Sequence, residues 1–396
     1  MEKLLVLVLA LTLVHPTIGV VIPRSYSSNG VYTLPIRRST VLPPDTHHSR
    51  SLKARAVGSI PAKNMLVHYS TFIEIGSPPT SYEVLIDTNS ANTWVGAGKA
   101  YVRTSTSEQT SNSVSVNYGS SSFSGTEFTD TVTMGPNLVI QKQSIGVAST
   151  SQGFSGLDGV LGLGPAGLTL GTLSPDSASI IPTVVDNLFS QKTIPSDIFS
   201  IYFEPATAEA QVNGEIIFGG TDSSKYTGNI IYAPITTTSP ANQSWAIDGS
   251  IRYGSTTAIM SNTPGIIDSG TSLVLLPTEA FQSFMQATGA TMDQATGLPT
   301  LTTAQFDALQ SLFITIGSTT LELTANACII PRSMNTQVGG NAGDIYLAFG
   351  DQGTKSGQGP TFTLGLAFLE RFYTVYDTAN KRIGLATTAF TRATSN

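Results

Sequence analysis

Hydrophobic and polar residues alternate in short runs along most of this chain. Such runs, rich in Val, Ile, Phe and Tyr, occur at residues 72–75, 114–118, 216–218 and 313–316. Turns containing Gly or Pro separate them, for example at residues 76–79, 135–137 and 317–318. Helical spacing is confined to residues 183–191, 279–287 and 303–309. Because period-two alternation between turn residues is typical of short strands, the pattern predicts a mostly β protein with few helices.

Two apolar runs in this chain end in the same polar pattern. Residues 84–90 read VLIDTNS, and residues 265–272 read GIIDSGTS. Each run ends in an aspartate, Asp87 or Asp268, followed by a hydroxyl residue, a turn residue and a second hydroxyl residue. A carboxylate on an apolar strand is costly to bury unless hydroxyl or backbone N–H groups hydrogen-bond to it. The repeat therefore predicts a duplicated half-site whose two aspartates meet in space.

The repeat continues beyond the aspartates. An apolar segment containing glycine follows each of them, at residues 157–164 and 362–368. Glycine at such a place lets one backbone pass close to another. This predicts a two-lobed β protein with internal pseudo-symmetry. Two facing carboxylates cannot both ionise easily, so they share a proton and offer an acid and a base together.

Composition excludes most other chemistry. The chain has one cysteine, Cys328, and four histidines, three of which lie in the first fifty residues. These are too few ligands for a zinc site, and no Gly-x-Ser-x-Gly nucleophile motif is present. The sequence also lacks a phosphate-binding glycine loop and a basic run that would bind nucleic acid. We therefore expect neither a metal nor a cofactor, and carboxylates remain as the catalytic candidates.

The N-terminus has the pattern of a secretory signal. Glu2 and Lys3 precede an apolar stretch at residues 4–14, which is too short to span a bilayer. We expect a signal peptide at residues 1–19, and no other stretch could cross a membrane. The pattern predicts a secreted, extracellular protein that is not bound to a membrane.

Charge separates the next segment from the body of the chain. Residues 20–55 contain six basic residues and one acidic residue, a net charge of +5, whereas the residues after them carry 13 basic and 24 acidic residues, a net charge of −11. We interpret residues 20–55 as a propeptide over an acidic cleft, released as carboxylates protonate at low pH. The alternative is a disordered linker with incidental charge. The body then divides into an N-terminal β lobe, residues 56–225, and a C-terminal β lobe, residues 226–396.

Further motifs accompany the two aspartates. They are NTWVGA at residues 92–97, SFSGTE at 122–127, QSIGVAS at 143–149, FLERFY at 368–373 and VYD at 375–377. With these motifs the chain resembles the pepsin-like aspartic peptidases from about residue 58 to residue 391. The resemblance implies a mostly β, two-lobed acid protease fold with pseudo-twofold symmetry and a central cleft.

The resemblance also implies roles for the duplicated motif. Asp87 and Asp268 would be the catalytic pair and would hold a water between them, with no covalent intermediate. One carboxylate would take the proton of the water while the other protonates the peptide carbonyl. The hydroxyl residues would support the two loops: Thr88 and Ser269 by bonds across the pair, Ser90 and Thr271 by bonds near the carboxylates.

A flap is implied as well. Tyr118, Gly119 and Ser120 resemble its tip, with Trp94 behind Tyr118, and Gly270 would contact substrate with them. Because Ser120 is uncharged, the expected preference is for apolar residues around the scissile bond. The expected partners are peptide or protein substrates and pepstatin-like inhibitors, and we expect a monomer.

The chain departs from the family pattern at two positions. Asn89 stands where the first motif has glycine, and Ser121 stands where a close family member has glycine in the flap. Asn tolerates the left-handed backbone that glycine often adopts, so the loop could survive. Its side chain would point into or beside the site, where it could donate a hydrogen bond to a carboxylate and lower its pKa.

Three functions follow from these observations. The first is a secreted endopeptidase that works at acid pH. The second is a pepsin-fold protein that binds peptides and, because of Asn89, cuts them weakly or not at all. The third is a β-rich carbohydrate-binding protein with Trp94 and Trp245 as stacking platforms. Separately, the sequon at Asn242 predicts N-glycosylation on an exposed loop.

Overall fold

The computed structural model describes residues 27–28, 31–39, 68–119, 121–135, 137–206, 212–358 and 361–396. The expected signal peptide and Ser120 lie outside the described residues. The strands of the N-terminal half are β1 Ser27–Ser28, β2 Val31–Ser39, β3 His68–Ile75, β4 Thr80–Asp87, β5 Trp94–Val95, β6 Glu108–Asn117, β7 Ser122–Gly135, β8 Leu138–Gln152, β9 Gly159–Gly162, β10 Leu173–Ser174, β11 Ile198–Phe203 and β12 Val212–Phe218. Those of the C-terminal half are β13 Thr227–Pro234, β14 Ala246–Tyr253, β15 Thr257–Ile267, β16 Val274–Leu276, β17 Thr291–Met292, β18 Pro299–Leu301, β19 Leu312–Ile316, β20 Thr319–Leu323, β21 Ile345–Tyr346, β22 Phe349–Asp351, β23 Phe362–Leu364, β24 Phe372–Asp377 and β25 Arg382–Thr387.

Short helices complete the fold. They are α1 Val184–Ser190, α2 Thr278–Thr288, α3 Thr303–Asp307 and α4 Leu366–Leu369. The first three lie where helical spacing predicts them. Thr183 and Thr302 begin α1 and α3 with capping boxes, which satisfy the free N–H groups of the first turn. The four-residue α4 is too short for periodicity to reveal it.

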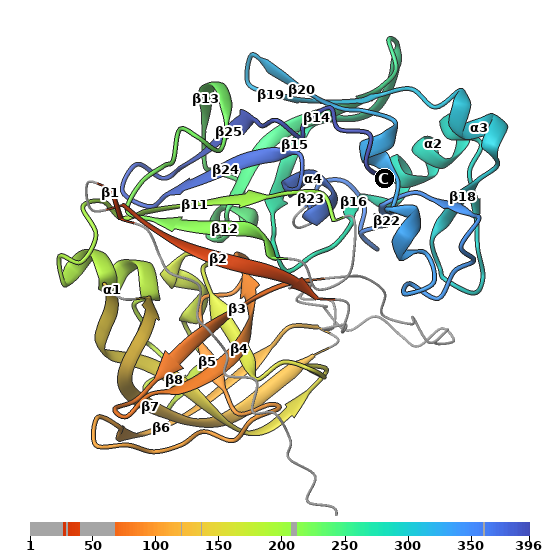
Figure 1. Cartoon of the computed structure of the whole chain (residues 1–396). Coiled ribbons are helices and arrows are strands. Elements are labelled where there is room, and N and C mark those ends of the chain that lie inside the picture. Colours follow the sequence, from red (N-terminus) through yellow and green to blue (C-terminus); the bar gives the residue numbers. More distant parts are fainter. Residues whose placement is uncertain are drawn as a thin grey trace, which may run out of the picture.

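The mostly β, two-lobed architecture is confirmed (Figure 1). In the N-terminal lobe the strands follow the order β10-β6-β7-β8-β5-β9-β4-β3. In the C-terminal lobe a second sheet follows the order β20-β19-β14-β15-β23-β16-β22. Apolar side chains of both lobes form one large buried cluster, so the lobes share a hydrophobic core.

The first sheet continues between the lobes through β2, β12, β11, β24, β25 and β13. Figure 1 shows β2 beside β12 at the boundary between the lobes. The expected lobe boundary near residue 225 falls between β12 and β13, so both halves of the chain contribute strands to this shared part. β2 belongs to the expected propeptide, pairs with both β3 and β12, and buries Leu34 and Ile36.

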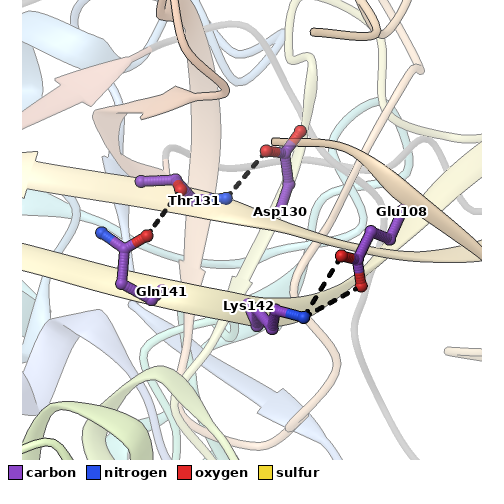
Figure 2. A network of polar contacts seen from close by, with 5 residues as sticks. All are labelled: Glu108, Asp130, Thr131, Gln141 and Lys142. Carbon is purple, nitrogen blue, oxygen red and sulfur yellow. Dashed lines mark hydrogen bonds and ion pairs between the residues drawn. The ribbon is translucent and has the colours of Figure 1, made fainter. Parts of the chain in front are cut away.

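A bulge bends the long β7–β8 hairpin of the N-terminal lobe. Its register shifts between Asp130 and Val132, where Lys142 on β8 adopts a φ of 53°. Figure 2 shows the polar contacts around it: Thr131 donates to Gln141, and Lys142 pairs with Glu108 of β6. Because the Lys142–Glu108 pair is mostly exposed, it contributes little to stability and mainly marks where β6 and β8 approach.

Candidate active site

The two predicted aspartates lie at equivalent places in the two lobes. Asp87 ends β4, which pairs in parallel with β9, and Asp268 directly follows β15, which pairs in parallel with β23. Both side chains are fully buried. Gly162 and Gly365 follow at matching positions, and a Cβ on either would lie 2.5 Å or less from the backbone after the aspartate of its own lobe. Glycine is therefore needed there for close passage of the two backbones, as the sequence predicts.

Each carboxylate accepts two matching hydrogen bonds from its own loop. The N–H of Asn89 donates to Asp87 Oδ1 at 2.8 Å, and that of Gly270 donates to Asp268 Oδ1 at 2.8 Å. The second oxygens accept from the hydroxyl groups of Ser90 at 2.5 Å and Thr271 at 2.6 Å. These bonds satisfy the buried carboxylates and hold both in one orientation.

The two loops also bond to each other. The N–H of Thr88 donates to Ser269 Oγ at 3.1 Å, and the N–H of Ser269 donates to Thr88 Oγ1 at 3.0 Å. The hydroxyl of Thr88 donates to the carbonyl of Ile267, and that of Ser269 donates to the carbonyl of Ile86. The fold thus brings Asp87 and Asp268, 181 residues apart in the chain, into a single buried site.

The structure corrects the expectation that Asn89 is accepted because Asn tolerates a left-handed backbone. Its backbone does not adopt a positive φ, and neither does that of Gly270, so tolerance of the left-handed region is not what allows Asn there. Its side chain is 3% exposed, and its Oδ1 is buried without a hydrogen-bond partner among the described residues. Asn89 supports Asp87 through its backbone N–H, as glycine would.

The expected flap corresponds to the antiparallel hairpin of β6 and β7. At its tip, the N–H of Tyr118 donates to the carbonyl of Ser121, and the N–H of Gly119, whose φ is 91°, donates to Asn117 Oδ1. Tyr118 is fully buried, and its hydroxyl accepts a hydrogen bond of 2.9 Å from the indole N–H of Trp94. Ser121 is buried too, with no partner for its hydroxyl among the described residues.

A third strand supports this hairpin on its outer edge. β10 pairs antiparallel with β6, joining Leu173 to Val114. Asn112 of β6 donates to Asp176 in the same connection. The hairpin is therefore flanked on both edges, by β10 beside β6 and by β8 beside β7.

Comparison with known proteins decides the family. A family model described as eukaryotic aspartyl protease matches residues 68–388. The chain belongs to the eukaryotic aspartyl protease family. Polyporopepsin from Irpex lacteus is 61% identical over 341 residues, which cover 86% of this chain and 100% of polyporopepsin. Gastricsin from Cavia porcellus is 30% identical over 351 residues, covering 83% of this chain and 82% of gastricsin.

The solved structures agree. The crystal structure of an aspartic proteinase from Irpex lacteus matches this aspartyl protease with a TM-score of 0.83 and 61% identity, covering 86% of this chain and 100% of that one. The protein is thus an aspartic endopeptidase with the pepsin-like fold.

Two tyrosines of the protease lie within electrostatic reach of the aspartates. Burial and then the negative charge of Asp87 raise the pKa of Tyr118. Burial likewise raises the pKa of Tyr376, and the charge of Asp268 adds to it. Both phenols therefore stay protonated over the whole range in which carboxylates titrate, so neither adds charge to the site.

Sequence reasoning misjudged the role of Trp245 and assigned none to Tyr376. Trp94 and Trp245 are 0% and 2% exposed, so neither is a stacking platform for a sugar, and the carbohydrate-binding interpretation is wrong. The indole of Trp245 instead reaches the carbonyl of Leu163 in the other lobe. Its place directly before the apolar start of β14 was a signal for burial. Tyr376 belongs to the motif VYD at residues 375–377, in a strand whose residues are all buried, but that motif by itself indicates no contact with the aspartates.

The described residues hold no group of three or more His, Cys, Asp or Glu side chains placed to bind a metal ion. Within the same residues, no helix is long and apolar enough to cross a bilayer.

Proposed function

We propose that this protein is a secreted endopeptidase that hydrolyses peptide bonds at acid pH through Asp87, Asp268 and an activated water, and that prefers apolar residues around the scissile bond. The observation that carries the proposal is the reciprocal bonding of Thr88 and Ser269, which fixes the two aspartate loops against each other. A pair that shares one proton requires a pH low enough to keep that proton bound.

The chemistry follows from one protonated and one ionised carboxyl group. The ionised group takes a proton from the water, and the water oxygen forms a bond to the peptide carbon. The protonated group gives its proton to the carbonyl oxygen, which produces a tetrahedral diol. The carboxyl group that took the proton of the water then gives it to the nitrogen, the other carboxylate takes a proton from a diol hydroxyl, and the C–N bond breaks as the carbonyl re-forms. Because Asn89 N–H and Gly270 N–H hold the two carboxylates in the same way, either can take either role.

Aromatic packing behind the flap supports the apolar preference. Trp94 stacks on Phe123 with ring centroids 4.1 Å apart, and Phe154 meets both Trp94 and Tyr118 edge to face. A substrate side chain under Tyr118 would meet this apolar cluster. A lysine or arginine there would lose its hydration without gaining a partner.

We also propose that residues 1–55 are removed. The match to polyporopepsin covers the whole of that protein and 86% of this chain, so it leaves out 14% of this chain. Residues 1–55 also make up 14% of this chain. The described parts of the leader form β1 and β2, and β2 pairs with both β3 and β12. The protein would then be a zymogen, cut near residues 55–57.

The alternative is a protein that binds peptides without cutting them. The buried, unpartnered Oδ1 of Asn89 favours it, because Asn89 is the one position within the two aspartate motifs that departs from the family. The bond from Asn89 N–H to Asp87 argues against it, since the catalytic geometry does not depend on glycine.

A direct assay separates the two. Acid-treated protein should digest denatured globin, and pepstatin should block the digestion. Asp87→Asn and Asp268→Asn should each abolish cleavage with an unchanged circular dichroism spectrum. Binding of pepstatin by a parent protein that cleaves nothing would support the binding protein, and an active Asp→Asn variant would refute the dyad.

A further inference from the structure

Trp245 contacts the backbone next to both aspartates. It directly precedes β14 in the C-terminal lobe, and its indole N–H donates to the carbonyl of Leu163 in the N-terminal lobe at 2.9 Å. The N–H of that same Leu163 donates to the carbonyl of Asp87 at 2.8 Å. On its other side, the carbonyl of Trp245 accepts from the N–H of Ile267, the residue before Asp268, at 2.9 Å.

These bonds close into a ring. The hydroxyl of Thr88, next to Asp87, donates to the carbonyl of Ile267 at 3.2 Å. The ring runs from Asp87 and Thr88 to Ile267, then to Trp245 and Leu163, and back to Asp87. Its members are buried, so water does not compete for their hydrogen bonds.

The indole is held in one orientation by its neighbours. Phe199 of β11 meets it with ring planes at 74°, and Tyr376 of β24 meets it at 67° with centroids 5.3 Å apart. Phe199 and Tyr376 stack on each other at 4.5 Å. A rigidly seated donor fixes the position of its acceptor, here the carbonyl of Leu163.

We propose that Trp245 is a positioning residue that sets the place of Asp87 relative to Asp268. It acts on the backbone through Leu163, whereas Thr88 and Ser269 join the loops directly. Without the indole N–H, the carbonyl of Leu163 loses its hydrogen bond. Leu163 directly follows β9 and its N–H binds the carbonyl of Asp87, so the position of Asp87 is then less firmly fixed. The inference rests on the proposed dyad, and the experiment below separates the two.

The test compares Trp245→Phe with Tyr373→Phe in the acid-processed enzyme. Tyr373 is a matched control, because it is fully buried in the shared sheet and its hydroxyl bonds to Ser200 and to the N–H of Asp222, outside the catalytic loops. We expect Trp245→Phe to lower kcat by ten- to a hundredfold, about the effect of a small misplacement of reacting groups. KM should change less than twofold. Tyr373→Phe should lower Tm but leave kcat within twofold of the parent.

The pH dependence of kcat/KM distinguishes a positioning role from a purely structural one, because a loss of stability alone would not change it. Two carboxyl groups that lie farther apart interact less, so their two apparent pKa values should approach each other in Trp245→Phe. The Tyr373→Phe profile should keep the parental separation. An unchanged profile and kcat in a folded Trp245→Phe enzyme would overturn the proposal.

A second variant covers failure of Trp245→Phe to fold. Replacement of Trp245 by benzothienylalanine keeps the ring size and exchanges the N–H for sulfur, so only the donor is lost. It should reproduce the fall in kcat and the narrowed pH profile, and parental values for both would refute the role of the N–H. If Asp87→Asn remains active in the same assay, the dyad itself is wrong. If Asp87→Asn is inactive while both Trp245 variants behave as the parent, the positioning role alone is wrong.

Discussion

Thr88 and Ser269 exchange two hydrogen bonds across the boundary between the lobes, each N–H donating to the hydroxyl oxygen of the other residue at 3.1 and 3.0 Å. Each residue directly follows an aspartate, so the position of either carboxylate is set by the opposite lobe. Both side chains are fully buried, which makes the loss of either hydroxyl expensive.

Thr88→Val should therefore damage both stability and activity. The change keeps the shape of the side chain but leaves the buried N–H of Ser269 without its acceptor, at a cost of about 1–3 kcal/mol. We expect a lower Tm and a fall in kcat/KM of at least tenfold. Thr288→Val, the same change at a buried position in α2, is the control. Equal losses of kcat/KM in the two variants would contradict the bracing role.

Asn89→Gly should raise kcat/KM severalfold. It removes a buried carbonyl oxygen that lacks a partner, which favours the folded state, while glycine loses about 0.5–1 kcal/mol through backbone entropy. These effects oppose each other, so Tm should change little. Steady-state kinetics on one peptide, with melting curves, test this. Asn89→Ala separates removal of the amide from removal of the Cβ. Equal or lower activity in Asn89→Gly would show that Asn89 is accommodated or used.

Ile36→Ala should lower the Tm of the precursor and leave the Tm of the processed enzyme unchanged. Ile36 is 1% exposed in β2, and such a truncation in a core costs about 2–5 kcal/mol. Acid treatment below about pH 5 should remove the leader as carboxylates protonate. N-terminal sequencing should then give a start near Val57, and the processed variant should melt with the processed parent. Active protein that still begins near Val20 would contradict removal of the leader.

Asp197→Asn should stabilise the protein at neutral pH. Burial, then the charges of Asp186 and Asp377, raise the pKa of Asp197 from 3.8 to about 6. Since the folded state binds this proton more tightly than the unfolded state, its stability falls as the pH rises from about 4 to 6. Asparagine does not ionise, so at neutral pH the free energy of unfolding of the variant should exceed that of the parent. The difference should be about 1–2 kcal/mol after allowance for partial exposure.

The measurement for Asp197→Asn is Tm against pH. Its Tm should exceed that of the parent at pH 7, and the two should converge near pH 4. The exposed Asp307→Asn controls for loss of one negative charge. A difference in Tm that stays constant with pH would show that Asp197 does not titrate in this interval.

Asn242 should carry an N-linked glycan when the protein is secreted by a eukaryotic host. It is exposed on a short 3₁₀ helix, Ala241–Gln243, as the enzyme that attaches the glycan requires. Intact mass should fall after glycosidase treatment, and Asn242→Gln should remove that difference. The neighbouring Ser244 is buried, so its replacement is a poorer control. An unchanged mass in the treated parent would refute the prediction.

The local sequence pattern predicted the features that depend only on residues close together in the chain. Alternation predicted the strands, helical spacing predicted three helices, and the repeated aspartate motif predicted the hydroxyl partners Ser90 and Thr271. These succeed because a hydrogen bond between residues i and i+3 of one loop needs no information from elsewhere. The same reasoning failed for Asn89, because the family's use of glycine does not reveal the φ of this loop.

The sequence by itself determined that two aspartates at the ends of duplicated apolar strands are the catalytic candidates of this protein. Only the tertiary structure decided that Trp245 joins the two aspartate loops and that β2 of the expected propeptide lies inside the shared sheet. Charge distinguished residues 20–55 from the rest of the chain, but only pairing with the distant strand β12 showed where β2 lies. Contacts of this kind depend on which distant parts of the backbone meet in the fold. Every residue carries a backbone carbonyl, so the type and spacing of a side chain do not specify which carbonyl it will bind.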